Sequence, residues 1–347
     1  MLQHMREHAH GESSATDERL GQIVRLLADT PMLVVSGTRI AEEVGVSRSE
    51  VWRLIEQLRQ LGVDIAGHPA TGYQLEKVPD LLIPDILAPM VRGTTIAAHI
   101  QHYFRVDSTN DAAIEAASAG APHGTVFVAE EQTAGRGRGA HSWSSQPSLG
   151  LYLSVLLRPE LPPTDVVILS LAAGLAVHAA VAELTGAEAD LRWPNDVLFG
   201  QKKFCGILTE LNAEITRVRY VVVGIGINVN HVEFPTEIAE LATSLCLQTG
   251  QQWSRAELAA RLLRALDREY RELMMSPTTA RESILRRFEK HSSFAVGRRV
   301  YVPEDGGYEG ITEGLDDRGF LKVRTASRLC TVLSGGVRAV ENGRVIQ

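Results

Sequence analysis

The residues best suited to chemistry form one short run, 131–140 (EQTAGRGRGA), in which glycines alternate with arginines after a predicted strand. Glycine lets the backbone approach an anion closely, and arginine adds a permanent charge with a forked set of donors. Such a loop can close over a phosphate and stabilise the charge that develops there. The spacing matches neither a P-loop nor a dinucleotide fingerprint. Taken alone, the run fits a phosphate-binding loop and a flexible surface loop equally well.

Four further clusters carry weaker signals. The run 107–110 (DSTN) precedes a predicted helix, which is typical of an N-cap and compatible with a binding site. The run 192–196 (RWPND) ends a strand and is typical of a turn. Lys203, beside an apolar strand, is either a solvated strand end or a partner for a carboxylate. In 224–230 (GIGINVN) the glycines either make room for another group or mark a β-bulge.

The segment in front of these clusters has the pattern of a winged helix-turn-helix. Helices are predicted over 17–29 and 37–44, and a third begins at Ser47, where SRSE fits a capping box. Val51, Leu54, Ile55 and Leu58 then recur at helical spacing. Two short strands, 63–65 and 72–75, complete the wing. A proline-containing stretch, 78–89, is predicted to be a linker.

The central and C-terminal parts predict two further domains. The strands of the centre follow one another without regular βαβ crossovers, which favours a mainly antiparallel or mixed sheet with helices on one face. The tail predicts a small β-barrel of short strands separated by turns. The predicted central elements are strands 125–130, 151–157, 205–211 and 220–229 and helices 110–119, 165–185 and 254–290. The predicted tail strands are 300–302, 308–313, 320–324, 329–332 and 337–340.

We therefore expect an α+β protein with a disordered tail over 1–16, a winged helix-turn-helix over 17–78, a catalytic domain over 79–292 and a β-barrel over 293–347. Three scattered cysteines without a CxxC pair indicate neither a disulfide framework nor a zinc site. The apolar stretch 166–181 is too short for a membrane span and predicts a buried helix. We expect a cytoplasmic protein without membrane contact.

Taken in order, the clusters resemble the biotin–protein ligase family. The resemblance is close over 106–230, and the winged-helix start and β-barrel end match its bifunctional ligase/repressor architecture, with a catalytic domain like that of class II aminoacyl-tRNA synthetases and an SH3-like barrel. It implies ATP, Mg²⁺ and biotin as ligands and a biotin carboxyl carrier protein, an acetyl-CoA carboxylase subunit, as acceptor. The residues it places near biotin are Ser108, Thr109, Asn110, Gln132, Arg136, Gly137, Arg138, Lys203 and Gly206. Those it places near ATP or the adenylate are Gly135, Arg138, Trp143, Asn195, Asp196, Gly226 and Asn228.

The implied reaction needs no protein nucleophile. The biotin carboxylate attacks the α-phosphate of ATP, and a carrier lysine then attacks the resulting mixed anhydride. Positioning and charge neutralisation by Arg136, Arg138, Lys203 and Mg²⁺ would supply most of the acceleration. The family usually reads Gly-Arg-Gly-Arg-x-Gly-Arg before the tryptophan, whereas this chain has Ala140 and His141 at the last two positions. We expect that departure to affect loop order and adenylate retention, not activity.

Three alternatives stand beside this hypothesis. A lipoate–protein ligase or octanoyltransferase shares the architecture but lacks the Gly-Arg-Gly-Arg loop. A biotin-sensing regulator without transferase activity would keep the winged helix and could lose Lys203 or Arg138, both of which are present. A plain DNA-binding protein would leave the glycine-arginine loop unexplained.

The front domain is expected to bind operator DNA through a recognition helix over 47–59, with Arg48, Ser49, Arg53 and Gln57 facing the groove. Residues 1–77 hold 11 acidic against 8 basic residues, so the domain lacks the usual basic footprint. We therefore expect a monomer to bind DNA weakly and a ligand-induced homodimer to bind it well. A domain that only stabilises or gates the enzyme is the alternative.

Overall fold

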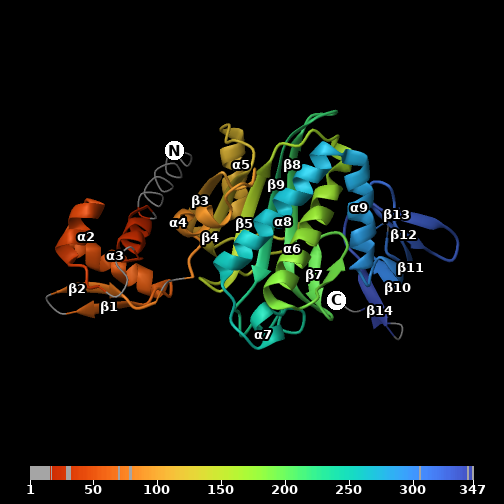
Figure 1. Cartoon of the computed structure of the whole chain (residues 1–347). Coiled ribbons are helices and arrows are strands. Elements are labelled where there is room, and N and C mark those ends of the chain that lie inside the picture. Colours follow the sequence, from red (N-terminus) through yellow and green to blue (C-terminus); the bar gives the residue numbers. More distant parts are fainter. Residues whose placement is uncertain are drawn as a thin grey trace, which may run out of the picture.

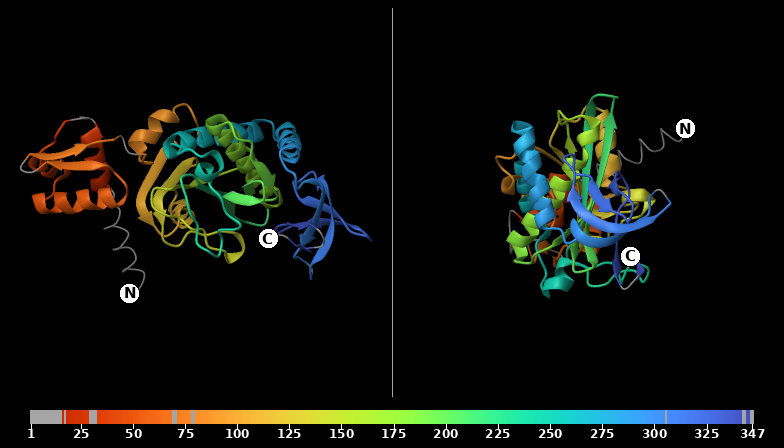
Figure 2. Two further views of the ribbon diagram at one scale, coloured as in Figure 1. Left: turned by 90° about the horizontal axis from the view of Figure 1, so that it is seen from below. Right: turned by 90° about the vertical axis from the view of Figure 1, so that its right-hand side faces the viewer.

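The computed structural model describes residues 16, 18–28, 33–68, 71–77, 80–304, 306–341 and 344–345. Three bodies follow one another along the chain: a helix-turn-helix domain, a large central domain and a C-terminal sheet (Figures 1 and 2). The predicted α+β class is confirmed. The predicted disordered tail, 1–16, lies outside the described residues except for Thr16.

The helix-turn-helix domain begins with a helical segment over 18–28, followed by α2 (Gly37–Val44), α3 (Arg48–Gln60) and a hairpin of β1 (Ile65–His68) and β2 (Gly72–Leu75). Its core contains the four apolar α3 residues that the sequence predicted. The capping box is only half formed. Ser47 Oγ accepts a bond from the Glu50 amide at 3.2 Å, but the Glu50 carboxylate turns to Arg53 instead of returning to the cap.

The stretch predicted as a linker contains α4 (Pro84–Met90), so that prediction is wrong in part. Pro84 opens the helix, where the missing amide hydrogen costs nothing. Leu82 and Leu87 are buried in the core of the central domain, whereas Leu81 and Ile83 are buried in the core of the helix-turn-helix domain. The connection is therefore a packed seam between the two domains.

The central domain is built on a seven-stranded mixed sheet in the order β3-β4-β5-β9-β8-β7-β6. Only β3 and β4 are parallel; every other neighbouring pair is antiparallel. The sequence analysis missed β3 and β7, and it implied β6, the strand that ends at the run 192–196, without giving its bounds. The strands are β3 (His99–Val106), β4 (Thr125–Gln132), β5 (Gly150–Leu157), β6 (Asp190–Arg192), β7 (Asp196–Phe199), β8 (Lys202–Ala213) and β9 (Val218–Asn228).

Helices cover both faces of this sheet, which corrects the expectation of one covered face. On one face lie α6 (Val167–Thr185), α8 (Arg255–Met275) and α9 (Pro277–Lys290), and on the other lies α5 (Thr109–Ser118) (Figure 1). Strand β4 shows the alternation, because Val126 and Val128 join the α6 core while Phe127 packs with α5. The helical stretch Pro163–Thr185 is longer than the predicted 166–181 and is long and apolar enough to cross a membrane. However, 78% of its most apolar 18 residues are buried inside the protein, as in the predicted core helix.

The C-terminal body is a six-stranded antiparallel sheet in the order β13-β12-β11-β10-β14-β15. It contains the strands that the sequence predicted. Among the described residues, its two outer strands, β13 and β15, do not pair with each other. A short helix, α7 (Leu245–Thr249), lies between the central strands and α8. The strands are β10 (Val296–Val302), β11 (Tyr308–Leu315), β12 (Leu321–Arg324), β13 (Leu329–Val332), β14 (Arg338–Glu341) and β15 (Arg344–Val345).

A buried ionic network joins the seam to the sheet. The Glu130 carboxylate on β4 lies 2.8 Å from Arg255 Nη1 and 3.1 Å from His102 Nε2, and it accepts the Leu82 amide at 2.8 Å. Arg255 Nε also pairs with Asp80 at 3.2 Å. Burial alone would raise the pKa of Glu130, but Arg255 and His102 outweigh it and lower that pKa to about 2. Glu130 therefore stays ionised, and its buried charge depends on Arg255 and His102 as partners.

Arg255→Ala tests this network. Removing the guanidinium leaves the Glu130 carboxylate buried without its main partner, so we expect a loss of about 3–5 kcal/mol of unfolding free energy at pH 7, measured by urea titration. The matched control is Arg261→Ala, in a more exposed pair with Glu183, for which we expect less than about 1 kcal/mol.

The same network predicts a pH dependence. Because the folded pKa of Glu130 lies below its ordinary value of 4.5, its stabilisation is complete above about pH 5 and is lost as the pH falls toward 2. Arg255→Ala should weaken this acid dependence. A variant as stable as the wild type, with an unchanged acid profile, would disprove the role given to the pair.

Candidate active site

The floor of the site is a patch of bare backbone on the central sheet. In β9, Gly226 pairs with Gly206 of β8, and Gly224 pairs with Leu208 of β8 and Ser154 of β5. A Cβ atom on Gly226 would lie 2.6 Å from Trp143 Nε1, and one on Gly224 would overlap Asn110 Oδ1. The register is regular here. The glycines therefore make room for other groups and do not mark a bulge.

The N-terminus of α5 places a polar cluster beside this floor. Ser108 is the N-cap, accepting from the Asp111 amide, so the N-cap interpretation is confirmed and the binding-site one stays a prediction. The Thr109 amide donates to Gln132 Oε1 at 2.8 Å. Ser154 Oγ donates to Asn110 Oδ1 at 2.5 Å, and Asn110 Nδ2 donates to Glu210 at 2.8 Å. These nearly buried hydroxyl and amide groups form a preorganised polar wall.

The glycine-arginine run is a tight hairpin. Trp143 N donates to Gly135 O at 2.8 Å, and Gly137 N donates to His141 O at 2.7 Å. At the tip, Gly139 has a φ of 66°, a left-handed conformation that favours glycine. The hairpin returns the chain at Trp143, whose ring lies over Gly226 and Gly206.

The two arginines of the hairpin have different partners. The Arg136 guanidinium binds Glu210 at 2.7 and 3.0 Å and Asp111 at 2.6 Å. Burial would lower the pKa of Arg136, but these two carboxylates raise it. Arg138 instead donates to the carbonyl of Gly335 in the C-terminal sheet and makes no ion pair with a described carboxylate. Burial lowers the pKa of Arg138. Arg138 is therefore the hairpin cation that can accept an anion.

A β-bulge directs Lys203 into the same site. Leu198 pairs with Lys203 but Val197 pairs with Cys205, so β8 carries one extra residue, and Lys203 Nζ comes to rest beside Gly206. Lys203 Nζ lies 2.6 Å from Asp196 and 5.4 Å from the centre of the Trp143 ring. Lys203 is thus a carboxylate partner, not a solvated strand end.

The run 192–196 forms the tight hairpin between β6 and β7. Burial would raise the pKa of Asp196, but Lys203 and Arg192 lower it, so the group is an anion that orders two cations. Asn195 Nδ2 donates to Ile207 O at 2.9 Å, which fixes this hairpin against β8.

Most of the predicted site residues line one cavity of about 40 Å³. Three do not: Gly135 lies under the Trp143 carbonyl, Asp196 reaches the site through Lys203, and Asn228 turns away to donate to Thr243 O at 3.0 Å. The predicted residues that line it are Ser108, Thr109, Asn110, Gln132, Arg136, Gly137, Arg138, Trp143, Asn195, Lys203, Gly206 and Gly226. The lining residues that sequence analysis missed are Leu153, Ile207, Leu208, Gly224 and Ile225.

The cavity is small, with an open volume of about 40 Å³. The Trp143 ring and the Lys203 side chain fill most of the space above the glycine floor. Trp143 Nε1 is buried without a hydrogen-bond partner. A ligand group that lies directly over Gly206 and Gly226 has to displace this ring, and the missing partner of Nε1 makes that displacement less costly.

The comparisons with known proteins agree with this geometry. Residues 103–228 match the model of the biotin/lipoate A/B protein ligase family, and residues 19–74 match an HTH domain. A biotin protein ligase from Aquifex aeolicus, solved in complex with biotin and ATP, is 32% identical with a TM-score of 0.60, covering 69% of this chain and 97% of that one. The fold and site therefore define a protein ligase of this class.

The match to whole proteins is more specific. The bifunctional ligase/repressor BirA of Bacillus subtilis is 33% identical over 91% of this chain and 97% of its own length. That of Escherichia coli is 30% identical over 82% of this chain and 87% of its own length. The chain therefore belongs to the bifunctional ligase/repressor family. A plain DNA-binding protein is excluded.

The glycine floor yields a testable prediction. Gly224→Ala should displace Asn110 and break its bond to Ser154, at a cost of about 1–3 kcal/mol in unfolding free energy measured by urea titration. Gly336→Ala is the control, because a Cβ there meets no atom within 4 Å. Equal urea midpoints for the two variants would show that the floor tolerates a side chain.

Proposed function

We propose that this protein forms biotinyl-5′-AMP from biotin and ATP, with release of pyrophosphate, and then transfers biotin to a lysine of a biotin carboxyl carrier domain. The observation that carries the proposal is one pocket in which a polar cluster on α5 faces two cations, Arg138 and Lys203, across a floor of glycines. Its helix-turn-helix domain makes it a repressor of biotin genes as well. We further propose a cytoplasmic location, which suits its three free cysteines.

The polar wall suits the ureido ring of biotin. Ser108, Thr109, Asn110 and Gln132 offer hydroxyl and amide groups that donate and accept hydrogen bonds, and the apolar lining by Leu208 and the Trp143 ring suits the rest of the molecule. Biotin then lies over the glycine floor with its carboxylate toward Lys203. The nucleotide side of the pocket would be formed by Asn195, Gly226 and the displaced Trp143, whereas Asn228 supports this region from behind through its bond to Thr243.

The first step forms a bond between a biotin carboxylate oxygen and the α-phosphorus of ATP, and the bond to pyrophosphate breaks. Lys203 orients the carboxylate, and Arg138 stabilises the charge on the phosphoryl oxygens. Arg136, held by Glu210 and Asp111, orders the hairpin that carries Arg138. In the second step the carrier amine attacks the anhydride carbonyl, an amide forms and AMP leaves. The closed hairpin keeps water from the anhydride.

Mg²⁺ fits the site as an ion that arrives with the nucleotide. Asp196 is the carboxylate nearest to Lys203 on this side of the pocket, and it is already bound by Lys203 and Arg192. Glu210 and Asp111 are both engaged by Arg136. Mg²⁺ commonly takes one carboxylate plus phosphates and water. Asp196 would hold it only in place of Lys203 or Arg192, so the ATP phosphates would supply most of its ligands. The ion would neutralise phosphate charge.

The transfer activity is tested with biotin, ATP, Mg²⁺ and a carboxyl carrier domain. Wild-type protein should biotinylate the carrier. Arg138→Ala or Lys203→Ala should reduce adenylate formation about 10- to 150-fold, because a charge-assisted contact is worth about 1.5–3 kcal/mol. Arg217→Ala, at an exposed arginine in the turn between β8 and β9, is the control and should act like wild type.

Two results would overturn this assignment. Biotin and adenylate binding without transfer would make the protein a biotin-sensing regulator. Transfer of lipoate or octanoate in place of biotin would assign it to the lipoate branch of the fold.

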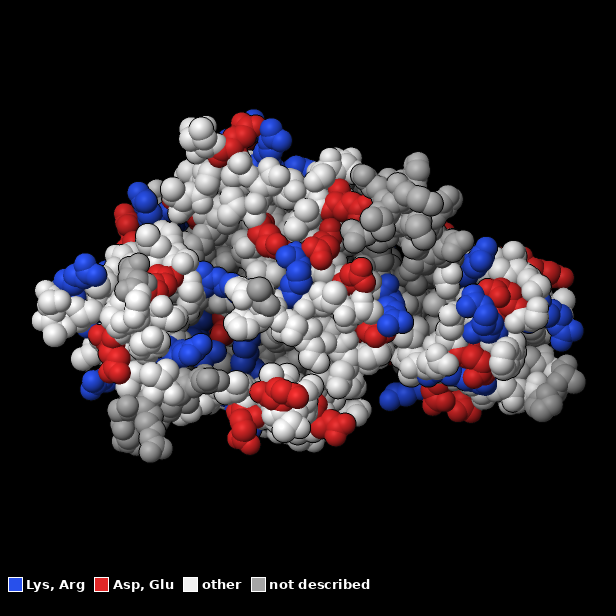
Figure 3. Space-filling model, turned by 180° about the vertical axis from the view of Figure 1, so that it is seen from behind, with Lys and Arg blue, Asp and Glu red and all other residues white. Residues whose placement is uncertain are grey.

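The DNA-binding role rests on α3 and the β1–β2 wing. Arg48, Ser49 and Arg53 are exposed as predicted, but Arg53 pairs with Glu50, and Gln57 is half-buried. Trp52, which was not predicted, is 59% exposed and lines with Arg48 a hollow of about 440 Å³ between α3 and the wing. In Figure 3 basic and acidic side chains are interspersed over the face opposite α6 and α8, without a single basic patch. We therefore propose that operator binding requires a ligand-induced homodimer.

Anisotropy titration on DNA upstream of a biotin-synthesis gene tests this proposal. Biotin plus ATP should tighten binding, and Arg48→Ala should weaken it by about 5- to 150-fold, since one good base contact is worth about 1–3 kcal/mol. Arg92→Ala, at an exposed arginine outside the domain, is the control. Equal binding with and without ligand would refute ligand control, and no binding in either state would leave the domain a structural role.

A further inference from the structure

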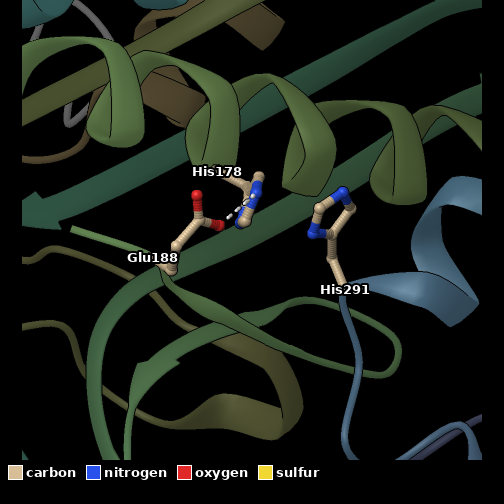
Figure 4. Close-up of side chains that lie close together, drawn as sticks. All are labelled: His178, Glu188 and His291. Carbon is tan, nitrogen blue, oxygen red and sulfur yellow. Dashed lines mark ion pairs between the residues drawn. The ribbon is translucent and has the colours of Figure 1, made fainter. Parts of the chain in front are cut away.

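A second polar cluster lies away from the active site, at the edge of the sheet where β6 begins. It consists of His178 from α6, Glu188 from the segment before β6 and His291 at the end of α9, and the three side chains point toward one another (Figure 4). One ligand atom from each residue lies within 4.8 Å of the other two. His178 is buried, His291 is half-buried and Glu188 is exposed, so the cluster opens to solvent on one side.

The hydrogen bonds of His178 fix its tautomer. Its Nδ1 lies 2.9 Å from the carbonyl oxygen of Ala189. A carbonyl only accepts, so Nδ1 carries the hydrogen, and Nε2 of the neutral ring presents a lone pair. That lone pair faces Glu188 Oε2 at 3.3 Å. Two acceptors at this distance repel unless a positive charge lies on the ring or between them.

The neighbouring ring of His291 disfavours a positive charge on the ring of His178. Its ring centre lies 4.1 Å from that of His178 at an interplanar angle of 42°, so two protonated rings would repel. No described residue hydrogen-bonds to a ring nitrogen of His291. The cluster thus offers two imidazole lone pairs and one carboxylate at a common point.

We propose that His178, Glu188 and His291 bind a divalent transition-metal ion of the Zn²⁺ class. Two imidazoles and a carboxylate form a donor set that suits such ions. Tetrahedral bonds of about 2.0–2.1 Å place neighbouring donor atoms about 3.3–3.4 Å apart, which matches the 3.3 Å between His178 Nε2 and Glu188 Oε2. The bond from Nδ1 to Ala189 O is the usual support for a ligating imidazole.

The bound ion is a structural clamp. It joins α6, the entry to β6 and the end of α9, where the chain already pairs through Leu191 N to His291 O at 2.9 Å and Ser293 N to Asp190 at 2.8 Å. The hairpin that follows β6 carries Asn195 and Asp196. The ion therefore holds the base of that hairpin and is independent of biotin, ATP and their Mg²⁺.

The test uses the full chain, freed of metal with a chelator and titrated with ZnCl₂ without biotin or ATP. Thermal unfolding should show Tm rising by about 5 °C or more at a hundredfold excess over Kd, since the ion binds only the folded cluster. Calorimetry should show one Zn²⁺ site per chain that is lost when a residue of the cluster is substituted. Co²⁺ in place of Zn²⁺ should give the visible absorption of a tetrahedral site.

Glu188→Gln is the decisive variant, because its side chain is 76% exposed and its loss spares the fold. It should abolish the Tm shift and the Co²⁺ spectrum, and His291→Asn should do the same. His99→Asn, at an exposed histidine outside the cluster, should keep both. The N-terminal residues His4, His8 and His10 remain in every variant, so metal bound there gives the same background throughout.

An unchanged Tm with ZnCl₂, or equal shifts in wild type and Glu188→Gln, would overturn the proposal. In that case the cluster is a contact between His178 and Glu188 that holds no metal ion.

Discussion

The active site depends on one constraint: two adjacent strands must expose bare backbone at the same level. Gly206 and Gly226 face each other across β8 and β9, and Gly224 follows one step along. Without side chains there, Trp143 can lie against Gly206 and Gly226, and Asn110 can lie against Gly224. The hairpin, the N-terminus of α5 and the re-aimed Lys203 are all placed around that opening. A methyl group on this floor would therefore disturb several elements at once.

The buried charged residues of this protein hold elements of the fold in place. Glu130 and Gln132 lie two residues apart on β4, one in the ionic network and the other in the active site. The network fixes the strand from which the glycine-arginine hairpin departs. On the other side of the network lies the seam to the helix-turn-helix domain, and Ser148, just after the hairpin, donates to Leu61 O at 2.7 Å. The DNA-binding and catalytic bodies thus share backbone supports within a few residues of the site.

The sequence patterns predicted those elements of the fold that are determined by residues close together in the chain. The helices α2 and α3 followed from neighbouring residues. The glycine-arginine run was expected only as a loop, and its hairpin bonds were not predicted. The edge strand β3 was missed because its run HIQHYFRV has little clean alternation, and α4 because its two prolines suggested a linker. The partners of Arg136 could not be predicted, since Glu210 lies 74 residues away and only folding joins them. Glu130 gave no signal either, because nothing in the sequence distinguishes a buried carboxylate from a solvated one.

The C-terminal sheet offers two backbone carbonyls to the catalytic body. Gly319 O accepts from Trp193 Nε1 at 2.8 Å, and Gly335 O accepts from Arg138. Trp193 is buried at the hairpin that carries Asn195, so one carbonyl serves each wall of the pocket. The positions of these backbone carbonyls depend on loop geometry and not on side-chain identity. The sequence of this sheet is therefore free to diverge, provided that its turns keep their shape. A chimera that exchanged it for a sheet with other turns would inherit a pocket with two loose walls.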